Sequence, residues 1–167
     1  MKLESPRLII RSFTEADIPD YAAIVADPRV TKYLGPDGSP HSFEEAEVYV
    51  RDVMRREAET GLARYAVVRK SAGDLIGFCG FKDIGAYIDF GWRYKYKVWG
   101  RGYGTEAAKA VLNYGSEVLD LTDIIAGAAV ENAASVKIIQ KLGFNTPEYS
   151  LKNGVWSVKF RWQKPSP

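Results

Sequence analysis

The sequence has one cysteine, Cys79, and one histidine, His41. A single cysteine excludes an internal disulfide and predicts a protein of the reducing cytoplasm. Because Cys79 lies in an apolar segment expected to be a strand, we predict a buried thiol rather than a nucleophile. With no second histidine and no Cys-x-x-Cys pair, we expect neither a metal site nor a Ser-His-Asp triad.

Long apolar runs and net charge are also missing. The opening MKLESPRLII has no apolar run long enough for a signal peptide or a membrane span, so no membrane association is expected. The net charge at pH 7 is only +2, and attraction to an anion must therefore come from a local patch. Hydrophobic residues (46%) and aromatic residues (13%) predict a folded protein. A length of 167 residues suits one domain, 1–167.

The periodicity of apolar residues predicts an α/β (α+β) fold. Strands and amphipathic helices follow one another in the order β-α-α-β-β-β-α-β-α-β. The strand-helix-strand unit over 87–130 is expected to be a right-handed crossover between parallel strands. The expected strands are 7–11, 65–68, 75–81, 87–94, 123–130 and 155–162, and the expected helices are 14–26, 42–61, 105–119 and 132–142, with a loop over 34–40.

Three glycines, Gly100, Gly102 and Gly104, stand between an expected strand and an expected helix. Glycine lets backbone N–H groups approach a ligand closely, and the start of a helix adds unpaired N–H groups and partial positive charge. A tight turn by itself would need only one glycine. We interpret the cluster as a diphosphate site, with Arg101 and neighbouring lysines adding charge.

Two common phosphate-binding patterns fail here. The phosphate loop of NTPases needs Gly-Lys-Ser/Thr, which is absent. The dinucleotide fingerprint matches by letter over Gly102, Gly104 and Ala107. That fingerprint requires an acidic residue after the next strand, whereas Asp120 and Asp123 come before it or at its start. We therefore reject a dinucleotide fold.

A third pattern fits better. The run WGRGYG from Trp99 to Gly104 resembles the acetyl-CoA loop of the GNAT superfamily of N-acetyltransferases, with Trp99 where that loop usually has Gln or Arg. The run is similar to the branch containing the ribosomal-protein N-terminal (alanine/serine) acetyltransferases. NAAS from Asn132 and KLGF from Lys141 resemble the Asn-x-x-Ser and Lys-x-Gly-Phe motifs of that branch, and RLIIR from Arg7 resembles its start.

The resemblance implies one GNAT-like domain, a mixed sheet of about six to seven strands with helices on both faces. Its fourth and fifth strands splay apart, and the pantetheine arm of acetyl-CoA lies in that gap. The arm pairs with the backbone of the fourth strand, the diphosphate rests on the glycine turn, and an asparagine contacts the pantetheine or the acetyl end. The cofactor-binding residues so implied are Trp92, Arg93, Tyr94, Gly100, Arg101, Gly102, Tyr103, Gly104, Thr105 and Asn132.

The catalytic roles are also implied by the resemblance. Many relatives carry a strand glutamate where Asp89 stands, so Asp89 is the candidate general base and Glu131 a second candidate. A backbone N–H near Trp92 or Arg93 would meet the oxyanion. Many relatives have a tyrosine seven residues after the asparagine, but this position is Ile139. Ser135 is then the candidate donor to the leaving thiolate, although Asn132 and Ser135 could equally form a helix cap.

The expected function is direct transfer of an acetyl group from acetyl-CoA to a primary amine in a ternary complex, with a protein N-terminus as the leading acceptor. Small amines such as antibiotics, polyamines and amino acids stay open, and since relatives are often dimers a homodimer stays open too. The alternative is a non-catalytic acyl-CoA or nucleic-acid binding module. Arg93, Lys95 and Lys97 alternate with aromatic residues, which in a strand would form a basic ridge beside stacking rings. The small net charge and the lack of a nucleic-acid-binding motif disfavour nucleic acid.

Overall fold

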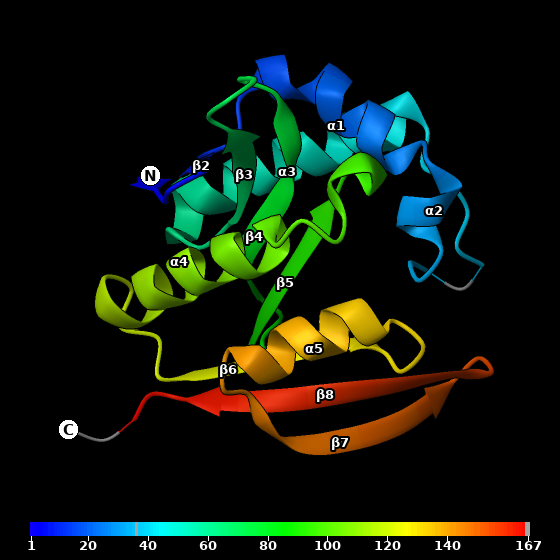
Figure 1. Ribbon diagram of the computed structural model, residues 1–167, viewed down its shortest axis with the longest axis vertical. Helices are drawn as coiled ribbons and strands as arrows, with labels where there is room; N and C mark the ends of the chain where they lie inside the picture. Colours follow the sequence, from blue (N-terminus) through cyan, green and yellow to red (C-terminus); the bar gives the residue numbers. More distant parts are fainter. Residues whose placement is uncertain (36, 166–167) are drawn as a thin grey trace.

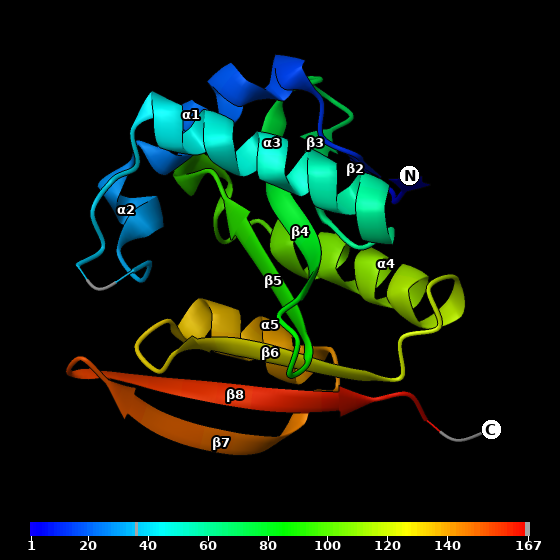
Figure 2. The same cartoon turned by 180° about the vertical axis from the view of Figure 1, so that it is seen from behind.

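The computed structural model describes residues 1–35 and 37–165, and one mixed sheet runs through it in the strand order β1-β2-β3-β4-β5-β6-β8-β7. Helices α4 and α5 cover one face of this sheet, and α1 and α3 cover the other (Figures 1 and 2). The strands are β1 Lys2–Glu4, β2 Leu8–Arg11, β3 Arg64–Arg69, β4 Leu75–Asp83, β5 Ile88–Tyr94, β6 Asp123–Ala129, β7 Asn145–Lys152 and β8 Val155–Gln163. The α-helices are α1 Ile18–Val25, α2 Pro28–Thr31, α3 Phe43–Thr60, α4 Tyr103–Glu117 and α5 Ala133–Lys141.

The predicted α/β class and the parallel pairing of the strands that flank α4 are confirmed, because β5 and β6 pair in parallel. Within the described residues the sheet has eight strands rather than six to seven. The two strands that the sequence pattern missed are β1, which has three residues, and β7, whose eight residues are all exposed. β1 is too short for its period to be read, and Pro147 within β7 disfavours a strand unless it lies at a sheet edge, as β7 does.

The Asp27-Pro28 pair follows the expected helix over 14–26 and begins a further short helix. Asp27 ends the turn after α1, and its side chain accepts a hydrogen bond from the Arg29 N–H, capping the short helix α2. Pro28 is the first residue of α2, where its missing N–H costs nothing. Part of the expected loop over 34–40, Pro36, lies outside the described residues.

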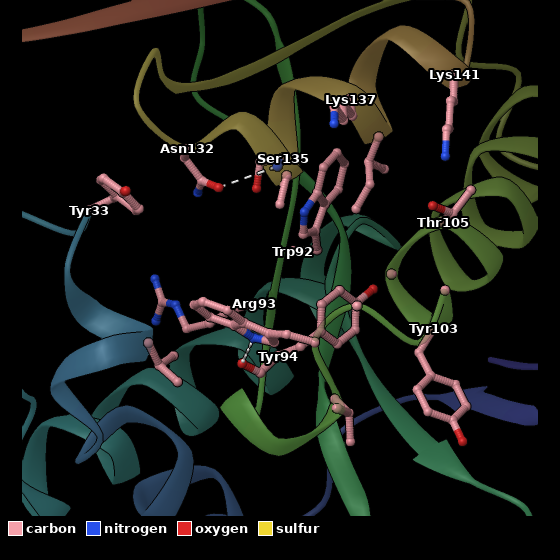
Figure 3. Close-up of a pocket in the computed structure, with 18 of the residues that line it drawn as sticks. Tyr33, Trp92, Arg93, Tyr94, Tyr103, Thr105, Asn132, Ser135, Lys137 and Lys141 are labelled. Atoms are coloured by element: carbon pink, nitrogen blue, oxygen red, sulfur yellow. Dashed lines mark hydrogen bonds between the residues drawn. The ribbon is translucent and has the colours of Figure 1, made fainter.

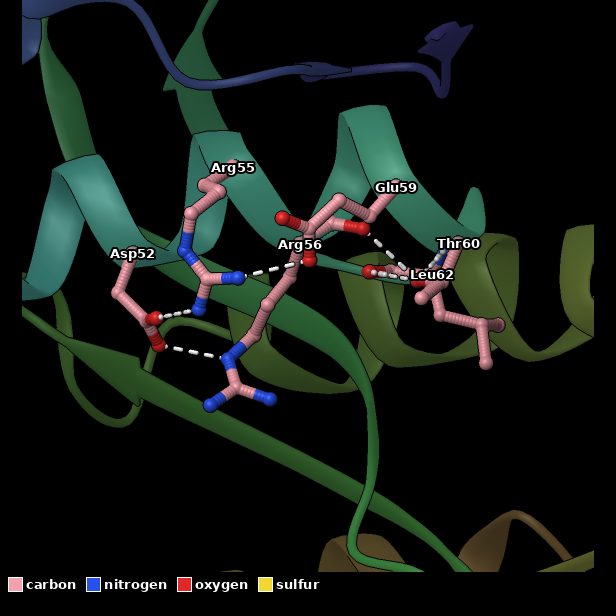
Figure 4. Close-up of polar contacts among 6 residues, drawn as sticks. All are labelled: Asp52, Arg55, Arg56, Glu59, Thr60 and Leu62. Atoms are coloured by element: carbon pink, nitrogen blue, oxygen red, sulfur yellow. Dashed lines mark hydrogen bonds and ion pairs between the residues drawn. The ribbon is translucent and has the colours of Figure 1, made fainter.

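Helix α3 is held by local signals that the sequence displays. Ser42 and Glu45 exchange hydrogen bonds in a capping box at its start. On its exposed side Asp52 pairs with two arginines and Arg55 also reaches Glu59 (Figure 4). Exposed pairs of this kind contribute at most about 0.3–0.5 kcal/mol each. We therefore read this cluster as local support for a helix, not as a binding site.

Three stacked aromatic rings close the base of the gap between β5 and β6. The Phe90 ring centroid lies 5.0 Å from that of Phe81 on β4 and 6.1 Å from that of Phe144 beyond α5. All three rings are buried. Such pairs contribute about 0.5–1.5 kcal/mol beyond their area. They hold the two halves of the sheet together below the point where the strands separate.

Helix α4 packs on this aromatic cluster, because its Gly115 lies against the Phe81 ring. None of the helices in the described part of the chain has the length and apolar character needed to cross a bilayer.

The predicted burial of Cys79 is confirmed, since the side chain is fully buried on β4. Burial raises the pKa of the Cys79 thiol to about 12, which keeps it protonated and unreactive at neutral pH.

Candidate active site

The glycine turn forms an open helix start. Gly100 (φ 72°) and Gly102 (φ 79°) have left-handed backbone conformations that other residues rarely adopt. The Glu106 N–H donates to the Gly102 carbonyl at 3.1 Å, so regular helical bonding begins only at Glu106. Among the described residues, no side chain caps this end of α4. The N–H groups before Glu106 therefore remain available to an anion.

The third glycine, Gly104, lies where a side chain would be crowded by two neighbours. A Cβ placed on Gly104 would lie 3.0 Å from Ile138 Cδ1 on α5 and 3.2 Å from Tyr94 Cε2 on β5. The start of α4 therefore lies against both elements that border the gap. The three glycines serve two purposes: two shape the turn, and one lets the turn approach the gap.

A set of hydrogen bonds from the N-terminal segment fixes the turn from outside. Glu106 accepts from the Ser5 hydroxyl (2.7 Å), the Arg7 N–H (2.9 Å) and Arg7 Nε (2.6 Å), and Arg7 Nη1 donates to the Arg101 carbonyl (2.9 Å). The Arg7 guanidinium also lies 4.3 Å from the Tyr103 ring centroid. Burial alone would raise the pKa of Glu106, but these hydrogen bonds and the Arg7 charge outweigh it and lower the pKa. Glu106 is therefore ionised at neutral pH and holds the turn in place.

Strand β5 leaves β6 where the expected splay lies. Parallel pairing ends at Phe90 and Ala126, whereas pairing with β4 continues to Tyr94 (Figure 1). The Arg93 carbonyl is directed at β4, because a Cβ on Gly77 would lie 2.0 Å from it. Backbone groups alternate along a strand, so those of Trp92 and Tyr94 face the gap. One of them is already used, since the Trp99 indole donates to the Tyr94 carbonyl at 2.9 Å.

A cavity of about 410 Å³ follows the gap from the glycine turn to the residues after α2 (Figure 3). Ten of the residues predicted from the sequence line it: Trp92, Arg93, Tyr94, Gly100, Gly102, Tyr103, Gly104, Thr105, Asn132 and Ser135. Two do not: Arg101, whose carbonyl accepts from Arg7, and Asp89, which lies farther down β5.

Two lysines that line the cavity are not among the site residues predicted from the sequence. Lys137 and Lys141 lie four residues apart on α5 and both line the cavity. Their spacing places them on one helix face, a signal that could have found them. Together with the open start of α4, they give this end of the cavity a positive potential suited to a diphosphate.

Asn132 caps α5, and it lines the cavity as well. Its side-chain oxygen accepts from the Ser135 N–H at 3.3 Å. The Ser135 hydroxyl forms no hydrogen bond with any part of the chain that the structure describes, and Ser135 also lines the cavity. Ile139, in the place of the usual tyrosine, is buried in the core. The geometry therefore leaves Ser135 as a hydroxyl free to donate into the cavity.

The two carboxylates predicted as bases lie in different surroundings. Asp89 pairs with the Arg64 guanidinium, which also donates to the Gly80 carbonyl. Glu131 lines a neighbouring groove of about 890 Å³ next to Tyr33, and Tyr33 lines both this groove and the cavity. The Tyr33 hydroxyl donates to the Glu131 carbonyl at 3.4 Å. Neither carboxylate lines the cavity, but Glu131 directly precedes Asn132, which does, and shares its groove with Tyr33.

The expected basic ridge does not form a continuous surface. Strand β5 ends at Tyr94, and Tyr96–Val98 form a 3-10 turn, so the alternation of a strand is lost. Lys95 pairs with Asp74 at 3.1 Å, while Arg93 reaches the Tyr21 hydroxyl on α1. The prediction of one cationic face was wrong because the strand is too short to carry it.

The family match covers the segments that form the cavity. Residues 7–145, which contain the glycine turn, the gap and α5, match the acetyltransferase (GNAT) domain. The chain belongs to the GNAT acetyltransferase family. It is therefore an acetyl-CoA-dependent N-acetyltransferase.

Individual relatives agree with this assignment. The GNAT chain is 31% identical to the uncharacterized N-acetyltransferase YnaD of Bacillus subtilis, over 91% of this chain and 87% of that protein. The crystal structure of a GNAT-family acetyltransferase from Bacillus anthracis superposes with a TM-score of 0.84 at 27% identity, covering 98% of each chain. RimL, a ribosomal L7/L12 α-N-protein acetyltransferase solved with coenzyme A, has the same fold (TM-score 0.83, 17% identity, 98% of each chain).

Proposed function

We propose that this GNAT enzyme transfers the acetyl group of acetyl-CoA directly to a primary amine, with the α-amine of a protein N-terminus as its first class of acceptor. The observation that carries the proposal is the continuity of the cavity from the glycine turn, through the gap, to Tyr33 and Arg93. Two substrates that enter from opposite ends would meet in the gap, so no covalent acyl-enzyme is needed. The fold shared with RimL supports the N-terminal class of acceptor, and small amines are the second class.

The coenzyme would be held by backbone and by cations. Backbone N–H groups of the turn and the start of α4 bind the diphosphate, with Lys137 and Lys141 opposite it. The pantetheine arm pairs with backbone groups of Trp92 and Tyr94, which face the gap. Because the Arg93 backbone is directed at β4, Arg93 is given no backbone contact with the pantetheine arm, contrary to the expectation from the sequence.

The reaction requires a neutral amine, an oxyanion donor and a proton for the thiolate. The amine nitrogen attacks the thioester carbon, the C–S bond breaks, and the sulfur takes up a proton. A backbone N–H at Trp92 or Tyr94 would stabilise the oxyanion. The Ser135 hydroxyl would donate to the leaving sulfur. Glu131 would accept the proton of the amine through water, ahead of Asp89, whose carboxylate is engaged by Arg64.

An acceptor screen with labelled acetyl-CoA tests the proposal. The panel holds peptides with free N-termini, the same peptides with blocked N-termini and an internal lysine, and small amines. We expect label on the free N-termini, and stabilisation of the fold by acetyl-CoA but not by a single-stranded oligonucleotide. Label only on small amines would move the assignment to the second class of acceptor. Stabilisation by the oligonucleotide alone would support the binding-module alternative and end the transferase proposal.

The assignment of the base is tested by a pair of variants. We expect Glu131→Gln to lower kcat/KM by roughly 100-fold or more below the pKa of the acceptor amine, and by less above it, because a neutral amine needs no base. Asp89→Asn should have a smaller effect of similar size at every pH. The measurement is a pH–rate profile of wild type and both variants. A pH-dependent loss confined to Asp89→Asn would return the base to Asp89.

The role of Ser135 is tested by Ser135→Ala. If the hydroxyl donates to the sulfur, kcat falls by about tenfold while the KM for acetyl-CoA changes little, since the lost hydrogen bond belongs to the transition state. Ser71→Ala, in an exposed turn, is the matched control. An unaltered kcat would leave Ser135 as a residue of the helix cap only.

A homodimer stays a prediction. Exposed apolar side chains gather on the β7–β8 hairpin, at Tyr149, Leu151, Val155 and Trp156. Strand β7 is also an edge strand, with one row of backbone groups that no strand of the described chain pairs. Both features support pairing with a second copy. A cytoplasmic location likewise stays a prediction.

A further inference from the structure

The side chain of Arg93 has a setting that coenzyme binding does not use. Trp92 and Tyr94 point to one face of β5, and Arg93 points to the other, toward α1 and α3. Its Nη1 donates to the Tyr21 hydroxyl at 2.8 Å. The guanidinium lies 5.3 Å from the ring centroid of Phe78 and 5.9 Å from that of Tyr49. Aromatic rings thus hold this cation in one place.

Not every hydrogen-bond donor of the Arg93 side chain has an acceptor. Its Nε is buried and has no hydrogen-bond partner, and the described residues place no carboxylate within 4 Å of the guanidinium. The nearby carboxylates are engaged elsewhere, Asp52 with Arg55 and Arg56 and Asp89 with Arg64. A partly desolvated cation with no anion is costly, and the cost falls when an anionic ligand arrives.

Arg93 stands at the end of the cavity away from the phosphate cradle. Figure 3 places Lys141 and Thr105 at one end, and Tyr33 and the Arg93 guanidinium at the other. Lys137 and Lys141, with the N–H groups of the turn, already serve the diphosphate. The cavity has no carboxylate among its described lining residues, so Arg93 faces it uncompensated. Among the described residues Nη2 of Arg93 has no hydrogen-bond acceptor and, unlike Nε, is not buried, so the outer edge of the guanidinium is the part available to the second substrate.

We infer that Arg93 is a specificity-determining residue that binds a carboxylate of the acceptor, so that this enzyme prefers amines that carry a carboxylate near the amino group. The inference rests on the proposed function and narrows its substrate class. A planar guanidinium suits a carboxylate, and here Nη2 and the second hydrogen of Nη1 could form the two parallel hydrogen bonds, since Tyr21 accepts only one hydrogen of Nη1. The carboxylate can belong to an acidic side chain that follows a peptide N-terminus or to a free amino acid.

The test compares acceptors that differ in one group. One pair is a peptide beginning Ser-Asp and the same peptide beginning Ser-Asn; the other is an α-amino acid and its carboxamide. With wild-type enzyme, we expect the carboxylate member of at least one pair to have a kcat/KM about 10- to 100-fold higher, the size of a charge-assisted hydrogen bond. Preference in the peptide pair identifies an acidic N-terminal sequence, and preference in the other pair identifies an amino acid.

Variants then assign the preference to Arg93. Arg93→Gln should remove it by lowering turnover of the carboxylate member, with little change for the neutral member and no loss of stabilisation by acetyl-CoA. Arg93→Lys should keep part of it, since the charge remains but the paired geometry is lost. Arg51→Gln is the control, because Arg51 is exposed on α3 and pairs with Glu15 and Glu47.

Several results would overturn the inference. These are equal use of both members of every pair, preference for the neutral members, an equal loss for both members in Arg93→Gln, or no acceptor used by an enzyme that acetyl-CoA still stabilises. A wild-type protein that acetyl-CoA does not stabilise would instead overturn the proposed function. Since the wild-type preference is measured first, the inference can fail even if Arg93→Gln does not fold.

Discussion

The Gly104→Glu variant should bind acetyl-CoA at least about 100-fold more weakly than wild type, because several charge-assisted hydrogen bonds would be lost at once. The Cβ of the new side chain would already lie 3.0 Å from Ile138 Cδ1 and 3.2 Å from Tyr94 Cε2. The carboxylate must therefore either point toward the glycine turn or push α4 away from the gap. Either way, a negative charge reaches the N–H groups that would otherwise meet the diphosphate. The measurement is the KM for acetyl-CoA, with the dissociation constant from titration.

Two further variants separate charge from general damage in this experiment. Gly104→Ala adds only the crowded Cβ, and we expect a loss of affinity well below that of Gly104→Glu. Lys109→Glu adds a negative charge at an exposed position of the same helix, and should leave the KM nearly unchanged. Wild-type affinity in a folded Gly104→Glu protein would show that the diphosphate binds elsewhere.

The second large effect concerns the contact that holds α4 on the sheet. A Cβ on Gly115 would lie 2.4 Å from Phe81 Cζ, closer than real contacts allow. We expect Gly115→Ala to lower the free energy of unfolding by about 1–3 kcal/mol, although alanine favours helices by about 1 kcal/mol over glycine. Phe81 also stacks on Phe90 at the base of the gap, so the strain would reach the site. Urea unfolding measures the change.

A double variant shows whether the ring is the cause. Phe81→Leu shortens the side chain opposite Gly115, so Gly115→Ala combined with Phe81→Leu should be less destabilised than the sum of the two single variants. Asn113→Ala, at an exposed position of α4, is the control and should change stability by less than about 1 kcal/mol. Strictly additive effects would rule out steric conflict with Phe81.

Local signals predicted much of the site. The turn of Gly100 and Gly102 has the left-handed backbone that glycine permits. Signals of this kind act over a few residues, so the sequence displays them directly. The resemblance of two separated motifs to one family then supplied the gap, the coenzyme and the position of Asn132.

Contacts between distant residues were beyond such reasoning. Glu106 is fixed by Ser5 and Arg7, about a hundred positions earlier, and Arg93 meets Tyr21 at a separation of 72 positions. The pairing of Asp89 with Arg64 likewise appears only in the folded sheet. A side chain's role depends on the partners that folding brings within reach, and one sequence does not show which partners those are.

The sequence by itself therefore determined the α/β class, most of the helices and strands, the glycine turn and the family that its motifs indicate, because period, turn chemistry and spacing are local. Only the tertiary structure decided where β5 leaves β6, which backbone groups face the gap, that Asp89 is engaged by Arg64, and that Arg93 faces the end of the cavity opposite the lysines. These depend on register and packing between segments far apart in the chain, which set direction and distance as well as residue type.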